Sequence, residues 1–147
     1  MTIILEIIRN PVLFPALVAW LVAQTIKVLL HMIFYGKIDY SRFIGSGGMP
    51  SSHSAFVMSL SVSIGLIHGW ASTYFAISLA LAFIVMYDAA GVRRAAGKQA
   101  AVLNDIIEEI QANRGIPAEK LKELIGHTPV EVIAGAILGV IISLILT

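Results

Sequence analysis

The 147-residue chain contains no cysteine and few charged residues. The absence of cysteine excludes disulfide bonds and metal sites built from thiolates. Charged residues make up only 13% of the chain, whereas soluble domains lie near roughly a quarter. With 58% hydrophobic residues and a strongly positive mean hydropathy, this scarcity of charge indicates an integral membrane protein with a single domain over residues 1–147.

The chain contains four long apolar runs. A spanning helix needs roughly 20 apolar residues, and residues 11–35, 51–68, 70–90 and 129–147 come close to that length. The sequence therefore predicts an all-α membrane protein with about four transmembrane helices. The second run is short and begins in polar sequence. Residues 1–10 are a candidate for a further short interfacial helix.

Residues 91–114 differ from these runs because apolar and charged residues alternate at helical spacing. This pattern predicts an amphipathic helix that continues from the third run. It ends near Gly115 and Pro117, which break helices. A shorter charged helix is expected over residues 118–124.

The basic residues predict the orientation. With four spans, residues 35–50 and 91–128 lie on one side, and both termini lie on the other. The first side carries Lys37, Arg42, Arg93, Arg94, Lys98, Arg114, Lys120 and Lys122. The second side carries Arg9 alone. The positive-inside rule then makes the first side cytoplasmic, which suits a bacterial cytoplasmic membrane.

The stretch "GGMPSSHSA", residues 47–55, opens the second run with glycine, serine and histidine. Gly47 and Gly48 allow the backbone to approach a ligand closely, and Ser51 is a good N-cap. The start of a helix suits an anion, above all phosphate. His53 can donate a proton to it. The alternative is a capped helix after a solvated loop.

The stretch "GHTPVE", residues 126–131, opens the fourth run. His127 and Glu131 are four residues apart, so the carboxylate can orient the imidazole as a nucleophile or base. The alternative for Glu131 is a capping box, with Thr128 as N-cap and Pro129 at the first helical position. The two roles of Glu131 are compatible.

Several cations lie near the same predicted face. Arg94 and Lys98 repel each other on one helix face unless an anion or acid relieves them, and Arg93 adds a third charge. The alternative is ordinary cytoplasmic charge bias. Lys27 lies well inside the first run, which favours an inward-facing partner. Both His31 and His68 lie near span ends, where an interfacial position is expected.

Three motifs, "GGMPSSHSA", "MYDAAGVRRAAGKQA" and "GHTPVEVIAGAILG", resemble the divergent branch of the type 2 phosphatidic acid phosphatase superfamily. That resemblance covers nearly the whole chain. It implies a phosphatase that needs no metal or other cofactor, in which one histidine attacks phosphorus and a second protonates the leaving oxygen.

The resemblance also assigns roles. It makes His127 the nucleophile, Glu131 its carboxylate partner and His53 the general acid. It assigns phosphate binding to Lys27, Ser51 and Ser52. Our interpretation of the residues adds Gly48, Arg93, Arg94 and Lys98 to the phosphate-binding set, with Asp88 in support; the two arginines take the place of arginines that the family pattern expects elsewhere. Two motifs depart from the family pattern: Phe34 and Tyr35 stand where an arginine-proline pair is expected, and Leu121 replaces an arginine before the nucleophile.

The expected partners are a lipid-linked phosphate substrate and membrane lipids, with no nucleic acid. The "GAILG" motif at residues 135–139 predicts close helix contacts within one chain or in a homo-oligomer. One alternative function is a non-catalytic lipid-phosphate binding or membrane assembly protein. A second is metal-dependent phosphoalcohol transfer, since "DAAGVRR" faintly resembles the signature of CDP-alcohol phosphotransferases. That signature needs two further spaced aspartates, and only Asp105 lies nearby.

Overall fold

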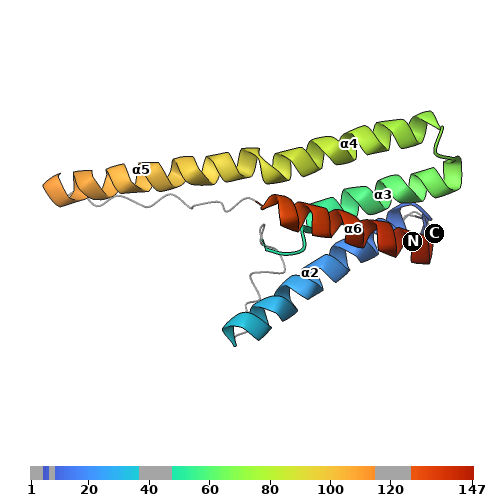
Figure 1. Ribbon diagram of the computed structural model, residues 1–147, viewed down its shortest axis with the longest axis horizontal. Helices are drawn as coiled ribbons and strands as arrows, with labels where there is room; N and C mark the ends of the chain where they lie inside the picture. The colour runs from blue at the N-terminus through green and yellow to red at the C-terminus, as the bar shows by residue number, and fades with distance from the viewer. Residues whose placement is uncertain (1–4, 7–8, 37–47, 115–126) are drawn as a thin grey trace.

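A computed structural model describes residues 5–6, 9–36, 48–114 and 127–147 of the chain (Figure 1). The described part contains helices and connecting turns and no strand. The helices are α2 (Leu13–Tyr35), α3 (Ser52–His68), α4 (Thr73–Ala90), α5 (Val92–Arg114) and α6 (Pro129–Leu146). Each predicted apolar run is a helix within a few residues of the expected bounds, so the all-α prediction is confirmed.

Polar side chains fix where the helices begin. Ser51 caps α3, because its side chain accepts a hydrogen bond from the amide of Ser54. Thr128 and Glu131 form the predicted capping box at the start of α6, with proline in the first turn. Each cap satisfies amides that a helix start leaves without an intrahelical acceptor.

Helices α2, α4 and α6 are long and apolar enough to cross a membrane. Helix α3 is shorter, at 17 residues, and it is rich in buried serine. It contacts α2, α4 and α6, so it is the central helix of the bundle. Because its neighbours shield it from lipid, α3 tolerates a polar composition that a lipid-facing helix does not.

Helices α3 and α6 pack at very short range. A Cβ atom added to Gly135 would lie 2.2 Å from the carbonyl oxygen of Ser51, and one added to Gly139 would lie 2.4 Å from that of Ala55. Only glycine fits at these two positions. The close helix contacts predicted from residues 135–139 therefore occur within one chain.

Helix α5 follows α4 after Gly91, and the two form one long rod whose α5 half projects beyond the bundle (Figure 1). Among the described helices, α5 contacts α4 alone. The predicted helix over residues 91–114 is thus confirmed. The helix expected over 118–124 lies outside the described residues. Within residues 1–10, Leu5 and Glu6 are helical.

The helix directions place four helix ends on the same side. The start of α3, the end of α4 and the start of α6 meet at one end of the bundle, and α2 contacts the start of α3 at Lys27 and ends on the same side (Figure 1). The opposite end holds the start of α2, the turn between α3 and α4, and the end of α6. The polar motifs singled out in the sequence all belong to the first end.

Candidate functional site

Backbone hydrogen bonds fix three of the four helix ends against one another. The amide of Ser51 donates to the carbonyl of Glu131 at 2.9 Å, and the amide of His127 donates to the carbonyl of Ala89 at 3.1 Å. The starts of α3 and α6 and the end of α4 therefore hold a fixed relative position. Side chains from these segments define the site.

The predicted His127–Glu131 pair is present. His127 Nδ1 lies 3.0 Å from Glu131 Oε2, and the histidine side chain is only 1% exposed. The same carboxylate oxygen accepts a hydrogen bond from the amide of Thr128 at 3.1 Å. Glu131 thus caps α6 and orients the imidazole at the same time. In the neutral ring Nδ1 donates to the carboxylate, so the lone pair lies on Nε2.

His53 meets this pair from the first turn of α3. Its ring centroid lies 6.2 Å from that of His127, and the two rings are inclined at 65°. His53 is half-buried, whereas His127 is buried. The two histidines, which are far apart in sequence, are therefore neighbours at the same end of the bundle.

Lys27 points inward, as the sequence predicted. Its side chain is 4% exposed, and Nζ donates to Gln24 Oε1 at 2.9 Å and to Ser52 Oγ at 3.0 Å. A buried ammonium group is costly without such partners. The cation is therefore held at the start of α3 beside Ser52, the residue that precedes His53.

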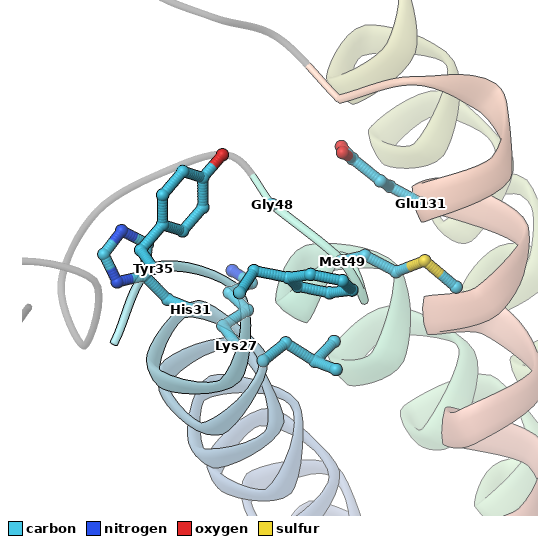
Figure 2. Close-up of a pocket in the computed structure, with 8 residues that line it drawn as sticks. Lys27, His31, Tyr35, Gly48, Met49 and Glu131 are labelled. Atoms are coloured by element: carbon cyan, nitrogen blue, oxygen red, sulfur yellow. The ribbon is translucent and has the colours of Figure 1, made fainter. Parts of the chain in front are cut away.

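A cavity of about 340 Å³ opens at this end, between α2 and α6 (Figure 2). Its lining residues are Lys27, Leu30, His31, Phe34, Tyr35, Gly48, Met49 and Glu131. In Figure 2 the Glu131 carboxylate reaches into the cavity from α6, opposite the helix that carries Lys27. The cavity is large enough for a phosphate group and has a cation on one wall.

The other predicted site residues take varied positions. Ser51 and Ser52 are buried; Ser51 Oγ accepts from Ser54 Oγ at 3.0 Å, and Ser52 Oγ accepts from Lys27. Gly48 lines the cavity with a positive φ of 84°, a conformation that glycine tolerates best. Asp88, on the last turn of α4, and Lys98, on α5, are exposed and do not line this cavity.

Arg93 and Arg94 occupy the first turn of α5, directly after the end of α4. They follow Ala89 by four and five residues, and the carbonyl of Ala89 accepts a hydrogen bond from the amide of His127. This position brings the start of α5 to the same end of the bundle as the two histidines.

Sequence reasoning missed two polar residues of the cavity wall. It expected an interfacial position for His31 and assigned no role to Tyr35, yet both line the cavity and their rings stack with centroids 4.7 Å apart. The signal was available, because Lys27, His31 and Tyr35 recur every four residues and therefore share one helix face.

The fold and the site together define an all-helical integral membrane protein with a polar site at one end of the bundle. The family model described as "Divergent PAP2 family" matches residues 8–142. The chain is similar to a Bacillus subtilis (strain 168) protein named "Uncharacterized membrane protein YuiD", at 42% identity over 97% of each chain. The chain thus belongs to the divergent PAP2 family. No solved structure matches.

Proposed function

We propose that the protein is an integral membrane phosphatase that hydrolyses a phosphomonoester or pyrophosphate of a lipid-linked substrate through a phosphohistidine at His127. The observation that carries this proposal is the buried His127–Glu131 pair, with a 3.0 Å contact, beside a second histidine at one end of the bundle. Membership of the divergent PAP2 family supports the same reaction class.

The chemistry divides between the two histidines. Nε2 of His127 attacks phosphorus, while Glu131 stabilises the positive charge that develops on the ring. His53 donates a proton to the leaving oxygen as the bond between phosphorus and that oxygen breaks. Water then attacks the phosphohistidine and releases inorganic phosphate. Because His127 is almost fully buried, a phosphoryl group reaches Nε2 only when a neighbouring side chain moves aside.

Lys27 is the cation that supports phosphate binding, because it lies on the cavity wall next to Ser52. Arg93, Arg94 and Lys98 on α5 add further positive charge at this end of the bundle. Asp88, at the end of α4, has a supporting role. Gly48 provides backbone at the cavity mouth. Electrostatic stabilisation of the charge on phosphorus then supplies the largest part of the rate.

The proposed topology has four spans: α2, α4 and α6, which are long enough to cross a membrane, and the shorter α3. At 1.5 Å per residue, α3 is about 25 Å long, close to the roughly 30 Å of the hydrocarbon core. The excess of basic residues on the segments that flank the site makes that side cytoplasmic. The substrate phosphate is then hydrolysed at the inner leaflet of the cytoplasmic membrane.

The test uses purified protein and radiolabelled lipid phosphates: phosphatidate, phosphatidylglycerophosphate and a polyprenyl phosphate. We expect inorganic phosphate release in the presence of a chelator and an acid-labile phosphoprotein that His127→Asn abolishes. His68→Asn, an exposed histidine at the opposite end of the bundle, is the matched control. Activity that is lost on chelation, restored by Mg²⁺ and retained in His127→Asn would contradict the mechanism.

One observation favours a second candidate, a lipid-phosphate binding protein without catalysis. Phe34 and Tyr35, on the last turn of α2, line the cavity where the related enzymes carry an arginine. Loss of that charge weakens stabilisation of a transition state more than it weakens binding of a ground state. If His127→Asn leaves lipid-phosphate affinity unchanged and the native chain shows no turnover, the binding function holds.

A further inference from the structure

A second cavity, of about 390 Å³, lies over the first turns of α3, between α2 and α4. Its lining residues are Leu17, Trp20, His53, Phe56, Val57 and Val85. His53 is the ionisable residue in this lining, and the others are apolar. We call this cavity the apolar groove.

The apolar groove has a floor and two walls from three helices. His53, Phe56 and Val57 of α3 form the floor, α2 forms one wall, and Val85 of α4 forms the other. Helices α2 and α4 do not contact each other, although both contact α3. Both walls are helices long and apolar enough to span the membrane, so the opening between them faces the hydrocarbon of the bilayer.

The groove ends at the proposed reaction site. His53 lines the groove, and its ring also lies 6.2 Å from that of His127. The polar cavity with Lys27 and Glu131 lies between α2 and α6, whereas the apolar groove lies between α2 and α4. His53 is thus the side chain shared by a groove open to lipid and a histidine pair beside a polar cavity.

We propose that the apolar groove holds the hydrocarbon chain of the phosphorylated lipid, which enters sideways between α2 and α4 and places its ester oxygen at His53. This inference rests on the proposed function and names its substrate class: the alcohol that leaves is the lipid. A chain of this kind fits because the groove is apolar along its length and opens to the medium in which the chain already resides.

The geometry also separates the two products. When the bond between phosphorus and the lipid oxygen breaks, a bond forms between phosphorus and His127 Nε2, and the proton from His53 goes to the lipid oxygen. The lipid alcohol then returns to the bilayer through the groove. Inorganic phosphate, released from His127 by water, leaves through the polar cavity beside Lys27.

Trp20 reports directly on the groove. The chain has two tryptophans, so Trp70→Phe leaves Trp20 as the single fluorophore. The experiment compares quenching of Trp20 by a phosphatidate with brominated acyl chains and by a phosphatidylcholine with the same chains. Both are present at the same low mole fraction in unbrominated vesicles. His127→Asn is added to prevent turnover.

We expect several-fold stronger quenching by the brominated phosphatidate. Val85→Phe fills the groove and should remove that excess. Ile84→Phe is the matched control, because Ile84 is the neighbouring residue on α4 and is 66% exposed. It should retain the excess.

Equal quenching by the two lipids would overturn the proposal, because the groove would then hold bulk lipid. Quenching by neither lipid would also overturn it, since protein, such as a second copy of the chain, would cover the groove. If Ile84→Phe as well as Val85→Phe removed the stronger quenching by brominated phosphatidate, the proposal would also be overturned. Binding in this assay does not depend on turnover, so failure to detect a phosphohistidine contradicts the proposed function separately.

Discussion

Glu131 shows how one residue serves folding and chemistry together. Its Oε2 atom accepts hydrogen bonds from the amide of Thr128 and from His127 Nδ1 at nearly equal distances, 3.1 and 3.0 Å. Neither partner competes with the other, since a carboxylate oxygen has two lone pairs. The helix cap and the His127–Glu131 pair therefore share one carboxylate oxygen. Substitutions of Glu131 and Thr128 distinguish its role in the cap from its role beside the imidazole.

We predict that Glu131→Gln lowers turnover by about 10²–10⁴-fold, by analogy with the loss of a triad carboxylate. The amide oxygen can still accept from the amide of Thr128 and from Nδ1, but a neutral amide no longer stabilises the positive charge that develops on the imidazole. Thermal unfolding should change little. The measurement is phosphate release together with the melting temperature.

Thr128→Ala is the matched control for Glu131→Gln. It removes the cap acceptor for the amide of Glu131 and should lower stability by about 1 kcal/mol while turnover persists. If Glu131→Gln is as active as the native chain, the proposed role of this carboxylate is wrong.

Lys27 is the second residue whose role can be isolated. We predict that Lys27→Met weakens inhibition by vanadate about 10- to 100-fold, the loss expected for a charged hydrogen bond of roughly 1.5–3 kcal/mol. Lys27→Arg should recover part of that loss, because it restores the cation. The measurement is the vanadate inhibition constant.

Arg9→Met, which removes an exposed cation before the start of α2, is the control for Lys27 and should leave vanadate inhibition unchanged. Equal vanadate sensitivity in Lys27→Met and the native chain would show that the ammonium group serves only the packing of α2 against Ser52.

At the scale of elements, the contact between α3 and α6 is the tightest feature of the fold. Gly135 and Gly139 allow the two backbones to meet, and a set of hydroxyl groups continues the contact toward the other end. The hydroxyl oxygens of Ser59 and Ser143 lie 2.8 Å apart, and so do those of Ser63 and Thr147. In lipid, where hydrophobic burial does not drive helices together, close packing and such hydrogen bonds hold the pair.

We predict that Gly139→Ala destabilises the protein by about 1–3 kcal/mol, the cost of overpacking a tight contact. The added methyl group would meet the backbone of Ala55, which can yield only if α3 and α6 separate. The measurement is unfolding in detergent. Val130→Ile adds one carbon on the same helix at a 64% exposed position and should have little effect. Similar stabilities of the two variants would contradict the packing argument.

At the scale of the whole molecule, the helix directions collect the chemistry at one end. The end of α4 meets the starts of α3 and α6 there, α2 contacts the start of α3 at Lys27 and ends on the same side, and α5 extends away from the bundle (Figure 1). Helix starts and helix ends carry opposite partial charges. The starts of α3 and α6 favour an anion, whereas the ends of α2 and α4 do not. Lys27 and the basic residues on this side supply the positive charge that makes the site suit an anion that approaches from water.

We predict that this end faces the cytoplasm. Because the native chain has no cysteine, single-cysteine variants report position without further changes. An impermeant maleimide should label Ala71→Cys, in the turn between α3 and α4, in intact cells. It should label Gln99→Cys, on α5, only after the membrane is opened. Labelling of Gln99→Cys in intact cells would reverse the orientation, and the native chain should stay unlabelled throughout.

The sequence by itself determined the elements. Apolar runs set the helices, and short-range polar patterns set where they begin: Ser51 before α3 and Thr128 before α6. Both effects act over one or two turns, so they can be seen in a local window. The His127–Glu131 contact was predictable for the same reason, since four residues along a helix is one turn.

Only the tertiary structure decided which faces meet. The family resemblance put His53 and His127 in one site, but the spacing of residues could not fix the distance between their rings. It also could not direct Lys27 to Ser52 or separate a polar cavity at Tyr35 from the apolar groove at Trp20. These relations depend on how helices far apart in sequence pack, and the clearance at Gly135 and Gly139 sets that packing for α3 and α6. The spacing of Gly135 and Gly139 predicted a close helix contact, but it could not identify α3 as the partner, because the fit between two backbones is a property of two surfaces together.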